Sequence, residues 1–213
     1  MSQPRLTTAG MMGLAPVIPV LTIARASDAL PLARALVAGG LRALEVTLRT
    51  PAALDAIALI AREVPDAVVG AGTVLNPGDW DRAEKAGARF IVSPGLTAPL
   101  ITVAAQSPLA YLPGIATASD LMRGLDAGLG HFKFFPAETS GGAPALKALH
   151  GPFADVRFCP TGGISAKTAP DYLALPNVIC VGGAWVAPTG AIEAGDWDLI
   201  TDLARTASKL AER

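Results

Sequence analysis

The segment that best indicates the fold is Ala43-Leu-Glu-Val-Thr-Leu48, followed by the turn Arg49-Thr-Pro51 and then by Ala52–Glu63. The first six residues are largely apolar or β-branched, which is typical of a strand in a sheet. Pro51 lies where a helix begins, so its missing backbone N–H breaks no hydrogen bond. Ala52–Glu63 has the composition of a helix. A strand, a short turn and a helix together form one repeating unit of a parallel α/β fold.

The same unit recurs along the chain. Further strands are expected at Val17–Leu21, Val68–Ala71, Phe90–Val92, Leu109–Leu112, Phe132–Phe135, Arg157–Cys159 and Val178–Val181. Helices are expected at Asp28–Ala38, from Asn76-Pro77 to near Gly87, and at Pro99–Gln106, Ser119–Ala127, Pro144–Leu149, Lys167–Leu175 and Trp197–Ala211, with an extra N-terminal helix at Arg5–Met12.

Eight strand–helix units favour a closed (β/α)8 TIM barrel over an open doubly wound sheet, which usually has five or six strands. No Gly/Ser/Pro-rich linker divides the chain. The sequence therefore predicts an α/β fold in which residues 1–213 form a single (β/α)8 barrel domain with an extra N-terminal helix.

Composition excludes several classes of partner. The net charge is −1 and no block of Lys or Arg stands out, so neither nucleic acid nor an anionic membrane is expected to bind. The apolar runs are shorter than the roughly 20 residues that span a bilayer, and the N-terminus lacks the layout of a signal peptide. Cys159 and Cys180 lie in apolar runs without the spacing of metal ligands, which is typical of buried thiols in a reducing compartment. We therefore expect a cytoplasmic protein.

One lysine has unusual surroundings. The chain has five lysines, and four of them lie in helix-like or loop segments beside Ala, Glu, Ser or Thr, whereas Lys133 lies in an apolar strand between Phe132 and Phe134. Burial disfavours the charged ammonium form, and the neutral amine is the form that attacks a carbonyl carbon. Alternatively, Lys133 lies at an edge, with its stem packed and its ammonium group in water.

Glu45 strengthens the catalytic interpretation of Lys133. In a strand, alternate side chains point to the same face, so Glu45, Thr47 and Arg49 share one face. These polar groups are expected to face the mouth of the barrel, where a carboxylate beside an amine can transfer protons. Arg49 at the strand end is suited to binding a substrate carboxylate. The alternative is that Glu45 and Arg49 form only structural ion pairs.

Glycine pairs follow the seventh and eighth strands, at Thr161-Gly-Gly163 and Gly182-Gly183. Glycine lets backbone N–H groups approach an anion closely, and phosphate sites of TIM barrels are often formed by these two loops. Metal catalysis is not expected, because the chain has only two histidines, His131 and His150, and no cluster of residues at ligand spacing.

The strand ends together resemble those of a class I family, the 2-dehydro-3-deoxy-6-phosphogluconate (KDPG) aldolase / 4-hydroxy-2-oxoglutarate aldolase family. The most specific segments are Leu44-Glu-Val-Thr-Leu-Arg-Thr50, Val69-Gly-Ala-Gly-Thr-Val74, Phe132-Lys-Phe-Phe-Pro-Ala-Glu138 and Phe158-Cys-Pro-Thr-Gly-Gly-Ile164. The resemblance implies that the chain is a carbon–carbon lyase that cleaves a 2-oxo acid sugar phosphate to pyruvate and glyceraldehyde 3-phosphate. It also implies activity on 4-hydroxy-2-oxoglutarate, the absence of any cofactor or metal, and a homotrimer.

The resemblance also implies a role for each site residue. Lys133 would form the Schiff base and Glu45 would transfer protons. Arg49 and Thr73 would bind the carboxylate end, and Pro94, Phe135 and Thr161 would shape the site or orient the substrate. The phosphate site would be lined by Gly162, Gly163, Gly182, Gly183 and Ala184.

Ala184 departs from the family pattern, in which serine usually follows the second glycine pair. The lost hydroxyl predicts a weaker hold on phosphate and leaves 2-dehydro-3-deoxy-6-phosphogalactonate open as an alternative substrate. A phosphate-binding barrel that forms no imine, whether an isomerase, a synthase or a non-catalytic binding protein, is the remaining alternative. It would leave Lys133 and Glu45 without a function.

Overall fold

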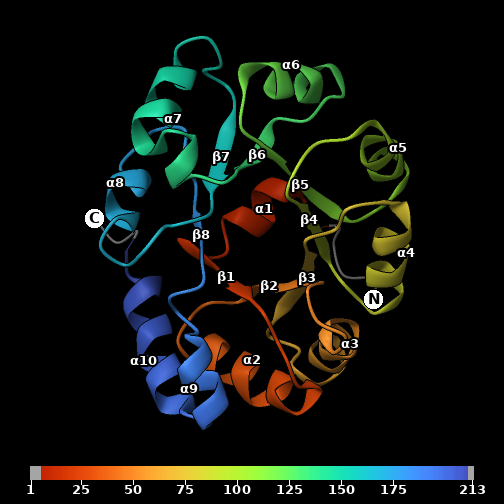
Figure 1. Ribbon diagram of the computed structural model, residues 1–213, viewed down its shortest axis with the longest axis vertical. Helices are drawn as coiled ribbons and strands as arrows, with labels where there is room; N and C mark the ends of the chain where they lie inside the picture. Colours follow the sequence, from red (N-terminus) through yellow and green to blue (C-terminus); the bar gives the residue numbers. More distant parts are fainter. Residues whose placement is uncertain (1–5, 211–213) are drawn as a thin grey trace.

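The computed structural model describes residues 6–210 and contains eight parallel strands surrounded by helices (Figure 1). The strands are β1 (Val17–Leu21), β2 (Ala43–Thr47), β3 (Val68–Gly72), β4 (Phe90–Ser93), β5 (Ala110–Ile115), β6 (His131–Phe134), β7 (Arg157–Pro160) and β8 (Val181–Gly183). They lie side by side in chain order, and β8 pairs with β1. The architecture is the TIM barrel expected from the sequence.

The helices follow the strands in turn. They are α2 (Ala29–Ala38), α3 (Ala53–Glu63), α4 (Pro77–Lys85), α5 (Ala98–Gln106), α6 (Ala118–Asp126), α7 (Gly142–His150), α8 (Ala169–Leu173), α9 (Thr189–Ala194) and α10 (Trp197–Ser208), with 3-10 turns η1 (Ala26–Asp28) and η2 (Glu138–Ser140). The extra N-terminal helix is α1 (Thr8–Met12). None of the helices within residues 6–210 is long and apolar enough to span a membrane.

The joint between β7 and β8 is one of the less regular pairings, as is that between β3 and β4, which has the single register pair Ala71 with Ile91. Pairs such as β2–β3 and β6–β7 form continuous ladders, whereas β7 meets the chain around β8 through only two isolated bridges, Phe158 with Val178 and Thr161 with Gly182. The barrel is therefore closed, but its last joint has few regular hydrogen bonds.

Two apolar layers hold the barrel together. The interior contains residues such as Ile18, Phe90 and Leu112, together with Met11 and Met12 of α1. A larger layer between strands and helices contains Val46, Ile91, Phe132 and many others. Because α1 places both methionines among the interior residues, one end of the barrel is filled and the chemistry is restricted to the other end.

Some expected boundaries were wrong. The eighth strand begins at Val181 rather than Val178. The backbone N–H of Val178 closes a turn on the carbonyl of Leu175, and Val178 then forms only an isolated bridge with Phe158. The helix expected at Lys167–Leu175 is the short α8, and helix α9 was not predicted. The first helix starts at Thr8 and the last ends at Ser208; the expected ends at Arg5 and Ala211 lie outside the described residues.

Candidate active site

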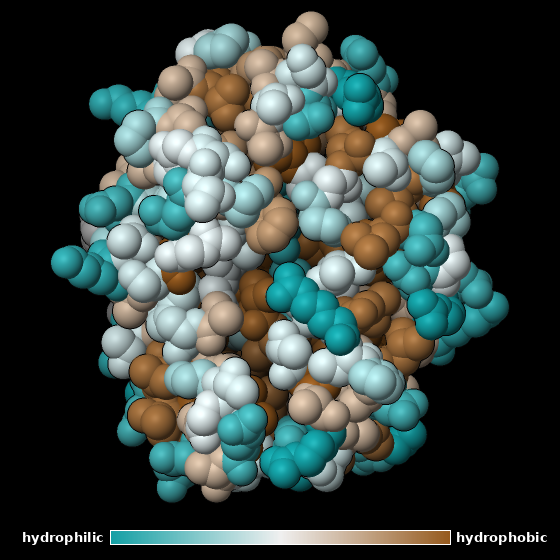
Figure 2. All heavy atoms as spheres, viewed as in Figure 1, coloured by the Kyte–Doolittle hydropathy of each residue, from teal (hydrophilic) through white to brown (hydrophobic). Residues whose placement is uncertain are grey.

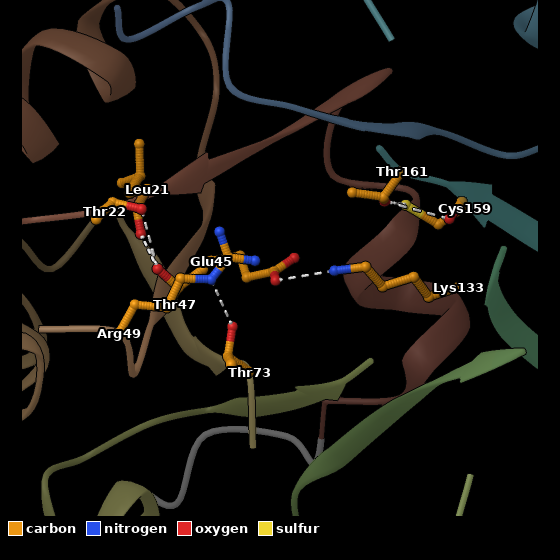
Figure 3. A network of polar contacts seen from close by, with 9 residues as sticks. All are labelled: Leu21, Thr22, Glu45, Thr47, Arg49, Thr73, Lys133, Cys159 and Thr161. Carbon is orange, nitrogen blue, oxygen red and sulfur yellow. Dashed lines mark hydrogen bonds and ion pairs between the residues drawn. The ribbon is translucent and has the colours of Figure 1, made fainter. Parts of the chain in front are cut away.

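Lys133 and Glu45 form an ion pair inside the barrel (Figure 3). Lys133 comes from β6 and Glu45 from β2, strands that are not neighbours, so the pair crosses the interior. The distance from Lys133 Nζ to Glu45 Oε1 is 3.1 Å, and the two residues are 6% and 2% exposed. Lys133 is therefore not an edge lysine with its ammonium group in water. An amine and a carboxylate in direct contact can exchange a proton without bulk solvent.

A glycine on the neighbouring strand makes room for the Glu45 carboxylate. Gly72 on β3 pairs with Thr47, two residues beyond Glu45 on β2. A Cβ atom at Gly72 would lie 2.8 Å from the carboxyl carbon of Glu45 and closer still to Oε1. Any side chain at position 72 would therefore displace the carboxylate from Lys133.

Arg49 follows β2, and its Nε donates to Thr73 Oγ1 at 3.2 Å (Figure 3). Thr73 has a φ of +59°, in the left-handed region that a β-branched residue rarely adopts. Backbone strain of this kind is concentrated at functional sites. Thr47, expected on the same face, instead donates its hydroxyl to the carbonyl of Leu21 at 2.8 Å and so ties β2 to β1.

An open cavity of about 490 Å³ lies above the ion pair, within the usual size range of small-molecule sites. Nine of the residues predicted for the site line it: Arg49, Lys133, Phe135, Thr161, Gly162, Gly163, Gly182, Gly183 and Ala184. The Phe135 ring centroid is 5.2 Å from Lys133 Nζ. Arg49 and Lys133 are the only charged residues in this lining.

The remaining three predicted residues lie behind this lining. Glu45 contacts Lys133, Thr73 accepts a hydrogen bond from Arg49, and Pro94 lies against Gly114, where a Cβ atom would overlap the Pro94 backbone. Val20, Ile164 and Trp185 line the cavity but were not predicted. Trp185 could have been found from its place directly after Ala184, whereas Val20 and Ile164 are apolar residues like many others.

The loop after β7 has the conformation that glycine permits. Gly162 and Gly163 have φ values of +104° and +81°, and neither position would accept a side chain without strain. Gly182 faces Thr161 so closely that a Cβ atom there would overlap the threonine side chain. Backbone N–H groups in such a loop can approach an anion directly.

A buried hydroxyl pair supports the loop that contains Pro94. Ser93 Oγ donates to the carbonyl of Gly95 at 2.7 Å and lies 2.8 Å from the Tyr111 hydroxyl. Burial raises the pKa of Tyr111 to about 12, so its proton is retained at neutral pH and can be donated to Ser93.

The histidines and cysteines take no part in the cavity. Burial, and to a smaller extent the charge of Arg157, lowers the pKa of His131, which lies at the opposite end of β6 from the loops. Cys159 and Cys180 are free and buried, and burial raises the pKa of the Cys180 thiol. Among the described side chains, no group of three His, Cys, Asp or Glu residues could hold a metal ion.

A parallel (β/α)8 barrel with a buried lysine, a contacting carboxylate and a glycine-rich loop beside them defines a barrel enzyme of the lysine-dependent class. Known proteins identify the family. Residues 9–203 match the family model described as KDPG and KHG aldolase. The KHG/KDPG aldolase of Escherichia coli (strain K12) is 58% identical over 192 residues, which cover 90% of each chain. The chain belongs to the KDPG and KHG aldolase family.

Solved structures agree with this assignment. The KDPG aldolase from Legionella pneumophila, with pyruvate captured as a covalent carbinolamine intermediate, is 50% identical, with a TM-score of 0.93 over 95% of this chain and 98% of that one. The 2-keto-3-deoxy-6-phosphogluconate aldolase of Zymomonas mobilis ZM4, with 3-phosphoglycerate, is 56% identical, with a TM-score of 0.92 over 97% of each chain.

Proposed function

We propose that the protein is a class I aldolase that cleaves 2-dehydro-3-deoxy-6-phosphogluconate to pyruvate and glyceraldehyde 3-phosphate. The observation that carries the proposal is the buried contact between Lys133 and Glu45 beneath an open cavity. Family membership supports the same reaction, as does the covalent pyruvate adduct of the Legionella relative.

In the proposed mechanism, the neutral amine of Lys133 attacks the C2 carbonyl and forms a carbinolamine, which loses water to give a protonated imine. The imine nitrogen withdraws electrons, so that removal of the C4 hydroxyl proton breaks the C3–C4 bond. The bonding pair becomes the C2–C3 double bond of an enamine, and glyceraldehyde 3-phosphate leaves. Protonation of C3 and hydrolysis of the imine then release pyruvate and the lysine amine.

Glu45 is the proton carrier in this scheme. Its Oε1 lies 3.1 Å from Lys133 Nζ. Besides Lys133, the cavity lining contains one charged residue, Arg49, and a guanidinium cannot give up a proton near neutral pH. Glu45 therefore takes a proton from Lys133 to free the amine and returns it to the carbinolamine hydroxyl, which leaves as water. It then takes the C4 hydroxyl proton and delivers it to C3.

The remaining roles follow from position. Arg49, held by Thr73, is the cationic group at the strand ends and binds the carboxylate of the 2-oxo acid. Phe135 forms part of the cavity wall, Pro94 shapes the site from the loop after β4, outside the lining, and Thr161 orients the substrate. The loops of Gly162, Gly163, Gly182, Gly183 and Ala184 receive the phosphate at the far end.

Borohydride reduction in the presence of pyruvate tests the imine. Reduced pyruvyl adduct is expected on Lys133 in peptide mass spectra, and intact protein that gives no adduct would refute the proposed function.

In Glu45→Gln, exchange of the methyl protons of pyruvate is expected to slow far more than adduct formation. Glu63→Gln, on the exposed end of α3, is the matched control and should change neither rate.

Cleavage of 4-hydroxy-2-oxoglutarate to pyruvate and glyoxylate is the second activity we propose. The Escherichia coli relative carries both substrate abbreviations in its name. Ala184 supplies no hydroxyl to bind the substrate phosphate. A phosphorylated substrate therefore has a smaller binding advantage over an unphosphorylated one than it would have in a chain with serine at this position. Cleavage of 2-dehydro-3-deoxy-6-phosphogalactonate is the alternative, and parallel assays of the three substrates rank them.

We also propose a cytoplasmic homotrimer that uses no cofactor and binds neither nucleic acid nor membrane. Two free buried thiols and a net charge of −1 support these assignments.

Figure 2 shows apolar and hydrophilic residues interspersed over one face. Met122 and Leu125, exposed large apolar residues on α6, are candidates for a contact between subunits. Sedimentation equilibrium should give three times the 21.7 kDa of one chain.

A further inference from the structure

Glu138 ends the Phe132–Glu138 segment, yet the reaction described above gives it no role. It begins the turn η2 and does not line the cavity that holds Lys133. Its side chain lies instead behind the glycine loop after β7. Any function of this carboxylate therefore lies outside the chemical step.

The backbone of this segment holds the glycine loop. The N–H of Ala137 donates to the carbonyl of Thr161 at 2.8 Å, and the N–H of Glu138 donates to the carbonyl of Gly162 at 3.1 Å. These two hydrogen bonds fix the peptides on both sides of Gly162, so their own N–H groups face a defined direction.

The Glu138 side chain occupies the space next to Gly163. A Cβ atom at Gly163 would lie 2.6 Å from Glu138 Cγ and 2.9 Å from Glu138 Cβ. The stem of Glu138 therefore packs directly against the Gly163 backbone, and Glu138 lines a separate hollow together with Tyr172 rather than the cavity of Lys133. Movement of Glu138 would remove the support beneath Gly163.

Tyr172 of α8 fixes the carboxylate. Its hydroxyl donates to Glu138 Oε1 at 2.8 Å, and the residue is 2% exposed. Burial, followed by the hydrogen bond to the Glu138 carboxylate and its charge, raises the pKa of Tyr172, so the proton is retained in this contact. Gly142, at the start of α7 with a φ of +62°, lets the chain pass close to the Tyr172 hydroxyl, because a Cβ atom there would lie 3.3 Å from that oxygen.

We infer that Glu138 and Tyr172 are positioning residues that hold the Gly162–Gly163 loop in the conformation that receives the substrate phosphate. This inference rests on the proposed function, because it assigns the loop to the phosphate end of the substrate. The two residues would set affinity for phosphorylated substrates and leave the imine chemistry of Lys133 unaffected.

Three variants test the inference. Tyr172→Phe removes the hydroxyl and Glu138→Ala removes the carboxylate and stem. Glu138→Gln keeps an oxygen that can accept the tyrosine hydrogen bond. We expect Tyr172→Phe and Glu138→Ala to raise KM for 2-dehydro-3-deoxy-6-phosphogluconate by about five- to tenfold with kcat nearly unchanged. This is less than direct loss of a hydrogen bond to a charged group would cause, because the two residues act on phosphate only through the loop. Glu138→Gln should restore most of the affinity, and Glu84→Ala, an exposed glutamate of α4, should have no effect.

Two pyruvate-only measurements separate the possible failures. Borohydride trapping and methyl-proton exchange with pyruvate need Lys133 and Glu45 but no phosphate site, so both should be normal in all variants. If wild type gives no adduct, the proposed function is wrong. If adducts form but KM for the phosphorylated substrate is unchanged, or if KM for 4-hydroxy-2-oxoglutarate rises equally, the positioning role is wrong. Loss of exchange in parallel with cleavage would show a purely structural role and would also overturn it.

Discussion

At the scale of single residues, Lys133 and Glu45 depend on each other for stability as well as for chemistry. Both are almost fully buried, and each is the hydrogen-bond partner that the other has in the described structure. Removing one member of a buried pair leaves an uncompensated charge, which is more costly than removing both.

Lys133→Met is therefore expected to lower the free energy of unfolding by about 3–5 kcal/mol, because Glu45 is left charged and unpaired. The double variant Lys133→Met/Glu45→Gln should recover a substantial part of this loss, since no buried charge remains. Urea unfolding at pH 7 measures both values. Lys85→Met, which breaks only an exposed pair with Asp81, is the control; equal stability of the single and double variants would contradict the argument.

Ala184 is the residue at which substrate preference can be changed. It is exposed at the cavity rim beside Gly183. Ala184→Ser adds a hydroxyl that can donate to phosphate, and a hydrogen bond of about 0.5–1.5 kcal/mol corresponds to a gain of about two- to tenfold in kcat/KM. The gain should appear with the phosphorylated substrate and not with 4-hydroxy-2-oxoglutarate. An equal change with both substrates would remove Ala184 from the phosphate site.

The chemical residues were the easiest part of the site to predict. Lysine and glutamate are rare inside apolar strands, so Lys133 and Glu45 stood out in the sequence alone. The Glu138–Tyr172 contact could not be predicted, because a glutamate after a strand and a tyrosine in a helix are common in any barrel. Their proximity depends on how α8 packs against the loop after β6, which no local pattern encodes.

At the scale of elements, β3 determines where the Glu45 carboxylate can lie. Gly72→Ala is expected to reduce methyl-proton exchange by at least tenfold, and adduct formation by much less, because its Cβ atom would push the carboxylate away from Lys133. Gly190→Ala on α9 is the matched control, since nothing lies within 4 Å of its added methyl group. It should leave the rates unchanged, whereas a fully active Gly72→Ala would show that the carboxylate has other room.

Most strands were predicted within a residue or two, but the fifth runs to Ile115, three residues past its expected end at Leu112, and the eighth begins three residues late. Its expected range began at Val178 because Val178-Ile-Cys-Val181 is a continuous apolar run. Apolar character identifies burial but not a continuous ladder: Val178 follows a turn closed on Leu175 and forms only an isolated bridge with Phe158. Helix α9 was missed for a related reason, because Pro188 and Gly190 gave its short sequence the character of a loop.

At the scale of the whole molecule, the number of strand–helix units predicted closure, but the sequence did not show which joints would lack a continuous ladder. Between β7 and β8, Ile179 N–H donates to the Phe158 carbonyl at 3.1 Å, in a region without a continuous ladder. Between β2 and β3, the Val68 N–H donates to the backbone carbonyl of Arg42 at 2.8 Å, next to a continuous five-residue pairing.

Amide hydrogen exchange should therefore be faster at Ile179 than at Val68, because local opening is easier where fewer neighbouring hydrogen bonds must break. A phosphorylated ligand, which would contact the loops after both β7 and β8, should slow exchange at Ile179 more than pyruvate does. Peptide-resolved or NMR exchange provides the measurement. Equal protection of the two amides would mean that packing alone secures this joint.

The position of Trp185 in the cavity also has an optical consequence. The chain has three tryptophans: Trp80 is fully buried with its ring centroid 5.1 Å from that of Tyr111, Trp197 begins α10, and Trp185 lines the cavity. Trp80→Phe/Trp197→Phe would leave Trp185 as the one tryptophan, with its ring beside Gly183, in the loop that the proposed function assigns to the phosphate. Its emission would then report the arrival of the phosphorylated half of the substrate separately from bond formation at Lys133, so binding and chemistry could be timed in one stopped-flow experiment.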